Sequence, residues 1–91
     1  MTGREKKIEF IKKLEVTNMD HEKVMIDFDT GRYFRLKGAA NDIWEILEDG
    51  MTFNQICTRL IAVYEVDKAI CEEHVESFLN MMVKYQFIKY V

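Results

Sequence analysis

The amino-acid sequence predicts an α+β domain in which a three-stranded antiparallel sheet is followed by three helices. Apolar residues recur with a period of two up to about residue 36, and with the period of a helix after residue 38. Strands that precede helices, instead of alternating with them, are typical of α+β proteins. The 91 residues contain no proline, no low-complexity tract and no repeat, so a single domain is expected over residues 1–91.

Three short apolar runs predict the strands. Their apolar residues are, in order, Ile8, Phe10, Leu14 and Val16, then Val24, Ile26 and Phe28, then Phe34 and Leu36. Turn-prone residues at 18–21 and 29–31 separate the runs, which predicts two hairpins and an antiparallel sheet. Lysine pairs at 6–7 and 12–13 fit a frayed arm equally well, which leaves residues 1–7 open as a disordered arm.

Three helices are predicted from apolar spacing and from residues that favour helix ends. The first lies between Gly38 and Gly50, and its apolar face consists of Ala40, Ile43, Trp44 and Leu47. The second begins with a capping box at residues 52–55. The third begins at Asp67 and runs to about residue 85, with an apolar stripe of Cys71, Val75, Phe78, Leu79 and Met82.

The composition favours an ordinary globular domain. Hydrophobic residues make up 48% and charged residues 32%, and no apolar stretch approaches the roughly 18 residues of a membrane span. No signal-like apolar core is seen near the start, so a cytoplasmic protein without a membrane partner is expected. Cys57 and Cys71 lie 14 positions apart within helical patterns, which predicts reduced, buried thiols.

No pattern in the sequence indicates catalysis or metal binding. His21 and His74 are 53 positions apart, and the chain has no nucleophile motif and no glycine-rich phosphate loop. Cys71 and His74 are one helical turn apart, but two ligands without a third make a poor zinc site. The sequence therefore predicts a protein that is not an enzyme and that holds no metal and no cofactor.

An ordered set of residues runs through the third strand and the three helices. It consists of Gly31-Arg-Tyr-Phe-Arg-Leu36, Ala40, Ile43-Trp44, Leu47, Gly50-Met-Thr52, Ile56, Leu60, Tyr64-Glu-Val66 and Val75-x-x-Phe78-Leu79. In this order the set resembles the PqqD family, the pyrroloquinoline quinone biosynthesis D proteins and their relatives, also called RiPP recognition elements. The resemblance covers residues 22–91. Three positions depart from the family pattern, since Lys37, His74 and Gln86 stand where Asn, Asp and Gly are usual.

The resemblance implies a fold similar to a winged helix-turn-helix and a function without chemistry. Members of the family bind the leader segment of a ribosomally made precursor peptide. The leader lies as an added strand along the third strand, in the groove against the third helix, and the core peptide is presented to a modifying enzyme. The implied partners are a leader peptide and an enzyme such as a radical SAM protein or a leader peptidase. The pathway stays open among quinone cofactor, lasso, thioether and other products.

The residues themselves favour the same surface. The third strand alternates Tyr33 and Arg35 on one face with Phe34 and Leu36 on the other, and an open strand edge can take up an extended peptide. The expected peptide-binding residues are Arg32, Tyr33, Phe34, Arg35 and Leu36 on the strand, with Cys71, His74, Val75 and Phe78 on the third helix. The alternative is that Phe34 and Leu36 only complete the core.

Charges give the expected groove a polarity. Four acids, Asp67, Glu72, Glu73 and Glu76, lie near the start of the third helix, and the strand opposite carries Arg32, Arg35 and Lys37. One basic and one acidic wall would orient a leader of mixed charge. The alternative interpretation is an acidic helix face that is simply solvated.

The acidic helix also bears on nucleic-acid binding. A winged-helix protein that binds DNA or regulates transcription is the second hypothesis, but its recognition helix would need cationic side chains. No nucleic-acid partner is therefore expected. A subunit-interaction domain without a peptide ligand is the third hypothesis. Because an open strand edge can also pair with another copy, the expected state is a monomer or a weak homodimer.

Overall fold

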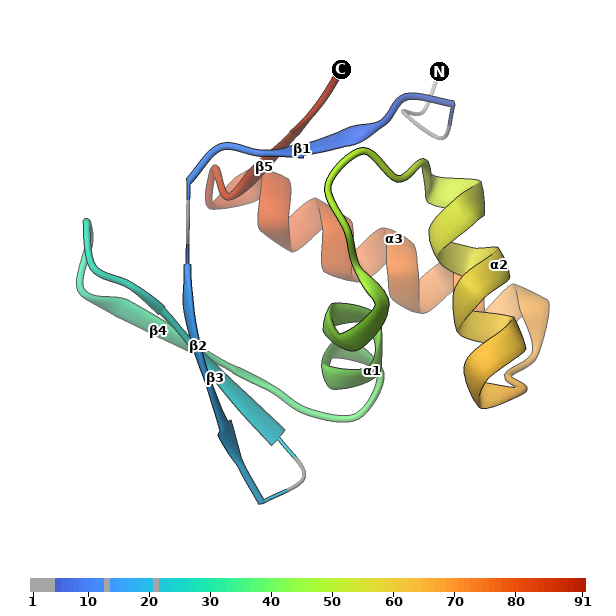
Figure 1. The fold of residues 1–91 in the computed structure, drawn as a ribbon, viewed down its shortest axis with the longest axis horizontal. Helices are drawn as coiled ribbons and strands as arrows, with labels where there is room; N and C mark the ends of the chain where they lie inside the picture. The colour runs from blue at the N-terminus through green and yellow to red at the C-terminus, as the bar shows by residue number, and fades with distance from the viewer. Residues whose placement is uncertain (1–4, 13, 21) are drawn as a thin grey trace.

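The computed structural model describes residues 5–12, 14–20 and 22–91. Its elements, in chain order, are β1 (Ile8–Phe10), β2 (Glu15–Met19), β3 (Glu22–Asp27), β4 (Arg32–Leu36), α1 (Ala39–Ile46), α2 (Phe53–Tyr64), α3 (Lys68–Lys84) and β5 (Ile88–Tyr90). The antiparallel sheet β2-β3-β4 projects to one side of the three helices, as Figure 1 shows. The predicted α+β class, with a three-stranded sheet before three helices, is confirmed.

The prediction of one first strand over residues 8–16 was wrong, because this segment forms two strands in two different sheets. β1 pairs antiparallel with β5, with Ile8 opposite Tyr90. Ile8 is fully buried, and its N–H donates to the Met51 carbonyl at 2.8 Å. The contacts that hold β1 therefore come from segments far along the chain, including a fifth strand that was not predicted.

The described part of the expected N-terminal arm bonds to the C-terminal end of the chain through Lys7. The backbone N–H and C=O of Lys7 both bond to Val91, at 3.1 and 2.8 Å. Residues 1–4 of the expected arm lie outside the described residues, as does Lys13. The β1–β5 pairing thus begins one residue before β1 itself.

The apolar alternation of the second predicted strand does not mark its buried face. Lys23, Met25 and Asp27 face the core side of β3, and Phe28 is 73% exposed. The two charged residues can be buried because each has partners. Lys23 Nζ donates to Asn41 Oδ1 at 3.1 Å and pairs with Glu45, both on or beside α1. These contacts tie the sheet to α1.

The predicted starts of the second and third helices are confirmed by their capping bonds. Thr52 and Gln55 form a reciprocal capping box, with N···O distances of 3.2 and 2.9 Å. Asp67 accepts from the N–H groups of Ala69 and Ile70 at the start of α3. Local sequence thus defines where α2 and α3 begin.

The core lies between the helices, the inner face of the sheet and the β1–β5 pair. Its buried apolar residues are Ile8, Met25, Leu36, Ile43, Ile46, Met51, Phe53, Ile56, Cys57, Leu60, Cys71, Val75, Phe78, Leu79, Met82, Phe87 and Ile88. Cys57 and Cys71 are buried and form no disulfide among the described residues, which confirms that prediction. Among the described residues, no helix has the length and apolarity needed to cross a membrane.

Helix α3 ends in a turn that requires a left-handed residue. Gln86 N–H donates to the Val83 carbonyl and Phe87 N–H to the Met82 carbonyl, at 3.0 and 2.8 Å. This is the Schellman pattern, in which glycine is usual at the position of Gln86. Gln86 has φ +62°, a conformation that strains a side chain with a Cβ.

Gln86→Gly is therefore expected to raise the free energy of unfolding by about 0.5 kcal/mol, because relief of the strained φ outweighs the larger unfolded-state entropy of glycine. Urea denaturation of both proteins measures the change. Gln86→Ala removes the same side chain but keeps the Cβ, so it should give no gain. Equal stabilisation by alanine would refute backbone strain as the cause.

Candidate peptide-binding site

Strand β4 is an edge strand of the three-stranded sheet. Within the described residues it pairs with β3 alone, so every second backbone N–H and C=O along it faces away from the sheet. Its side chains alternate as predicted: Tyr33, 69% exposed, and Arg35 point outward, whereas Phe34 is partly buried and Leu36 is buried. The strand therefore offers both an open backbone edge and two distinct faces.

Aromatic contacts fix the start of β4 against the end of α3. The ring of Phe34 lies 4.9 Å from that of Tyr85 and 5.4 Å from that of Phe87, centroid to centroid. The guanidinium of Arg32 lies 5.3 Å from the centroid of the Tyr85 ring. These contacts hold the strand and the helix in a defined relative position.

A small apolar cavity lies at the other end of β4, where the chain enters α1. It has a volume of about 260 Å³ and is lined by Ala39, Ala40, His74, Ser77, Phe78 and Met81. The α3 residues His74, Ser77 and Met81 continue to Tyr85 at helical spacing, so one stripe of α3 extends from this cavity to Phe34. We call this cavity, together with the surface that continues from it along the stripe to Phe34, the β4–α3 cleft.

The structure places the predicted site residues in three groups: on the open strand, in the cavity and in the core. Arg32, Tyr33, Phe34 and Arg35 lie along the open strand, and His74 and Phe78 line the cavity. Leu36, Cys71 and Val75 are 2%, 1% and 0% exposed, so they support the cleft from the core. Sequence reasoning missed five residues of the cleft: Ala39, Ala40, Ser77, Met81 and Tyr85. Helical spacing from His74 would have found the last three.

Several charged side chains of the predicted basic and acidic walls interact with other groups of the same chain. Arg35 donates to Glu22 at 2.6 and 2.8 Å, and Lys37 lies 3.7 Å from the same carboxylate. The hydrogen bond from Arg35 lowers the pKa of Glu22, against the opposing effect of burial. Asp67 caps α3, so its carboxylate faces the helix backbone.

Glu76 points toward β5, away from the cleft. Burial raises the pKa of Tyr90 on β5, and the nearby charge of Glu76 raises it further. Glu73, which is exposed, lies one turn before Ser77 and so borders the cleft. The polarity available to a ligand is therefore weaker than the sequence suggests.

The β3–β4 turn, which positions β4, is held by the buried carboxylate of Asp27. Lys12 Nζ donates to both of its oxygens, at 3.2 and 3.1 Å, and Thr30 Oγ1 donates at 3.0 Å. The N–H of Asp29 adds a bond at 3.2 Å. Burial raises the pKa of Asp27, but these hydrogen bonds outweigh it, and the pKa lies below its ordinary value.

A lowered pKa in the folded state makes stability depend on pH. The ionised Asp27 stabilises the fold above the unfolded-state pKa of about 4, and this contribution is lost as the pH falls through the folded-state pKa. Asp27→Asn is therefore expected to be less stable than the wild type at pH 7, with a smaller difference at pH 2–3. Thermal melts of both proteins between about pH 2 and pH 7 measure this difference in stability. A constant difference at all pH values would contradict the assignment.

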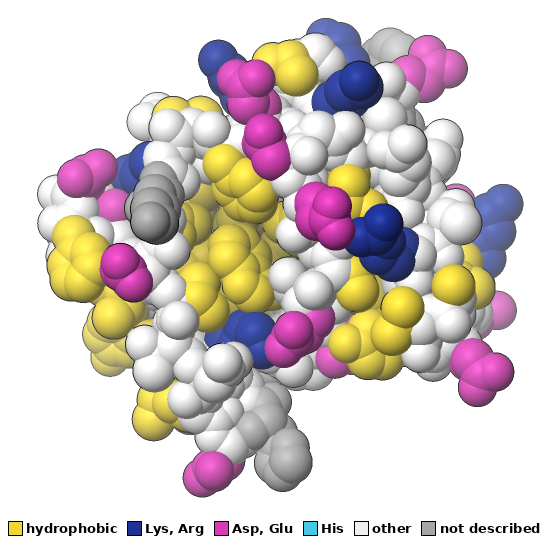
Figure 2. All heavy atoms as spheres, viewed as in Figure 1, with side chains coloured by type: hydrophobic (Ala, Val, Ile, Leu, Met, Phe, Trp, Pro, Cys, Tyr) yellow, Lys and Arg dark blue, Asp and Glu magenta, His cyan; other side chains and the backbone are white. Residues whose placement is uncertain are grey.

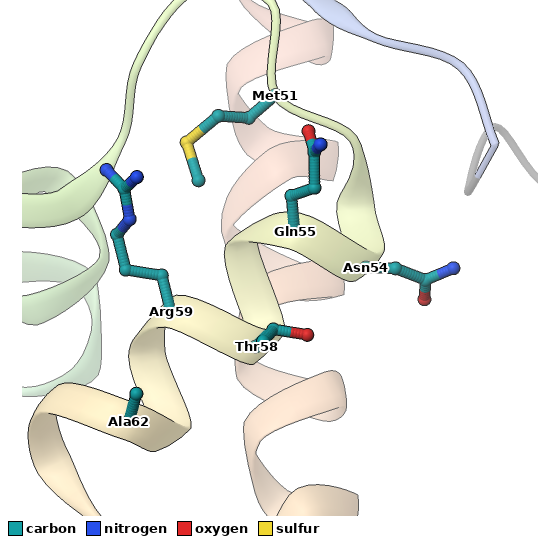
Figure 3. A pocket seen from close by; sticks show the side chains of 6 residues that line it. All are labelled: Met51, Asn54, Gln55, Thr58, Arg59 and Ala62. Atoms are coloured by element: carbon teal, nitrogen blue, oxygen red, sulfur yellow. The ribbon is translucent and has the colours of Figure 1, made fainter.

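A larger cavity elsewhere lacks the features of a site. It has a volume of about 540 Å³ along α2, and Figure 3 shows that its side chains do not converge, since Asn54 and Thr58 point away from Met51. Gln55 is engaged in the capping box and Arg59 pairs with Glu48 at 2.7 Å. Over the part of the chain that the structure describes, no three His, Cys, Asp or Glu side chains could share a metal ion.

A sheet with an accessible edge strand, placed beside three helices, defines a winged helix-turn-helix-like α+β domain. The chain belongs to the PqqD family: the family model described as "Coenzyme PQQ synthesis protein D (PqqD)" matches residues 22–88. The solved structure "TbiB1 in Complex with the TbiA(beta) Leader Peptide" is similar, with a TM-score of 0.73 and 26% identity, over 89% of this chain and 94% of that one. A comparison with curated proteins gave no match.

Proposed function

We propose that this chain binds the leader segment of a ribosomally synthesised precursor peptide and presents it to a maturation enzyme. The observation that carries the proposal is the open edge of β4 beside the apolar β4–α3 cleft. The similar structure of TbiB1, whose title names a leader peptide, supports it. In this role the chain acts in the cytoplasm as a single non-catalytic domain over residues 1–91.

The leader would join the sheet as a strand antiparallel or parallel to β4. Main-chain bonds to the open edge supply affinity that is independent of leader sequence. Every second leader side chain would point toward α3, where Phe34, Met81 and the two alanines of α1 form an apolar surface. Specificity would then come from apolar leader residues spaced two positions apart.

Separate residues of the cleft would serve separate parts of the leader. Tyr85 and Phe34 form the aromatic end, and His74 with Ala39 and Ala40 forms the narrow end beside α1. Glu73 at the border would favour a basic leader residue nearby, because opposite charges fix register more than affinity. Cys71, Val75 and Leu36 would act only by supporting this surface.

The proposal is tested by titrating the labelled leader of the precursor peptide with the protein. We expect saturable one-to-one binding by the monomer. His74→Glu and Glu73→Lys should keep the fold, checked by circular dichroism, and change the dissociation constant about 5- to 30-fold. Random-sequence duplex DNA at about 150 mM salt should bind only in the weak non-specific range. Unchanged leader affinity in both variants and in Arg35→Glu would show that the cleft is the wrong site.

A further inference from the structure

A second groove lies at the other edge of the three-stranded sheet. It is a hollow of about 490 Å³ lined by Phe10, Ile11, Lys12, Leu14, Trp44 and Leu47, and we call it the β2–α1 hollow. Figure 2 shows a concave patch of hydrophobic side chains between the sheet and α1. Apolar surface concentrated in a concavity of this size indicates a binding site more than an ordinary surface does.

The side chains of the hollow are of the types that anchor protein partners. Trp44 and Phe10 meet edge to face, with centroids 6.0 Å apart and an interplanar angle of 74°. Both are only partly buried, and Ile11 is 50% exposed. Partly exposed aromatic residues held rigidly in a concavity are typical hot spots of interfaces.

An open strand edge borders the hollow. In the part of the chain that the structure describes, β2 pairs with β3 alone, and Leu14, which lines the hollow, leads directly into β2. Lys23 on β3 closes the space toward α1 through its bonds to Asn41 and Glu45. The arrangement repeats that of β4 and α3, in which an edge strand lies beside an apolar space. An extended segment can therefore add to β2 and place alternate side chains in the hollow.

The surroundings of the hollow are acidic. Residues 39–50 carry four acids and no lysine or arginine, and two of these acids, Glu45 and Glu48, pair with Lys23 and Arg59 from outside the segment. Lys12, the cation in the lining, is neutralised by Asp27 and Asp29 at 3.1 and 3.5 Å. Exposed Glu15 starts β2, and Asp49 accepts the N–H of Phe10 at 2.8 Å. Such a rim favours a segment with lysine or arginine, and it disfavours a second copy, which would bring two acidic rims together.

We infer that the β2–α1 hollow docks an extended segment of the maturation enzyme in which lysine or arginine alternates with apolar residues. The inference rests on the proposed function, which supplies the enzyme. β2 and β4 are the two edges of one sheet, so strands added to both would lie on the order of 20 Å apart. Enzyme and leader would then be held at once, on opposite edges of the same sheet.

Trp44 allows a direct test because it is the only tryptophan of the chain. The full chain is titrated with a short peptide of alternating lysine and valine, and with the matched peptide of alternating glutamate and valine. Neither contains tryptophan, so the emission reports the hollow. The basic peptide should change the emission and bind about tenfold more tightly than the acidic one. Equal affinity for both peptides, or no change in emission, would overturn the inference.

A matched pair of variants locates the binding. Ile11→Ser should weaken the basic peptide about fivefold. Ile70→Ser, at a residue exposed to nearly the same extent (52% against 50%) but on α3, should leave its binding unchanged. An equal loss in both variants would overturn the inference. So would a concentration-dependent dimer in sedimentation that Ile11→Ser abolishes, because a second copy would then fill the hollow.

Titration with the leader peptide distinguishes a failure of this inference from a failure of the proposed function. Ile11→Ser should bind the leader like the wild type, which supports two independent sites. Loss of leader affinity in Ile11→Ser would overturn the separation of the sites. A wild type that binds the basic peptide but no leader would refute the proposed function and, with it, the role of the hollow in leader processing.

Discussion

Replacing Met81 by aspartate is expected to weaken leader binding about 30-fold or more, equivalent to about 2 kcal/mol. Met81 lines the cavity of the β4–α3 cleft and is only partly buried. A carboxylate there would have to be desolvated whenever the leader covers it, and no lysine or arginine lines this cavity to compensate. Fluorescence anisotropy of the labelled leader measures the loss.

Asn80→Asp is the matched control, because it places the same charge on the neighbouring, exposed position of α3. It should leave the affinity within about twofold of the wild type. Circular dichroism and a thermal melt show whether Met81→Asp remains folded. If Met81→Asp folds and binds the leader with wild-type affinity, α3 does not form the second wall of the site.

Replacing Phe87 by alanine is expected to lower the free energy of unfolding by about 3–5 kcal/mol. The Phe87 side chain is fully buried and contacts both Phe34 and Tyr85, with centroids 5.4 and 6.1 Å away. Its loss would leave a cavity beneath the junction of β4 and α3. Since the total free energy of unfolding of a domain of this size is only about 5–15 kcal/mol, the variant should be close to unfolding.

Phe28→Ala removes the same ring from a position that is 73% exposed, and it should change stability by less than about 0.5 kcal/mol. Guanidinium titrations of the three proteins give the comparison. Similar losses for Phe28 and Phe87 would show that the aromatic contacts beneath β4 contribute little. A stable Phe87→Ala that binds the leader normally would show that they do not position the strand.

The helices could be predicted because their signals are local. A capping box at Thr52, an acidic cap at Asp67 and apolar residues at helical spacing all lie within the segments that they define. The split of the first strand could not be predicted, because β1 is held by β5 and by Met51. Alternation alone does not identify the partner of a strand.

For the same reason, only part of the geometry of the candidate site could be predicted from the sequence. The alternation of Tyr33 and Phe34 identified the two faces of β4, which follow from the geometry of any strand. The cleft also needs Ala39 and Ala40 from α1, and no pattern in the sequence places them beside Met81. The ion pairs of Arg35 and Lys37 with Glu22 depend on the residue-by-residue register of β3 and β4, which was not predicted.

The pairing of β1 with β5 also determines when the domain can finish folding. Residues 8 and 90 are partners, whereas the hairpins of β2, β3 and β4 join neighbouring segments, so the β1–β5 contact closes a far longer loop. Long loops cost more entropy to close and slow the steps that need them. During synthesis, the hairpins that carry the open edge of β4 can form before residues 88–90 emerge from the ribosome. Ile8 is fully buried in the folded domain, and it can pair with Tyr90 only after residues 88–90 have emerged.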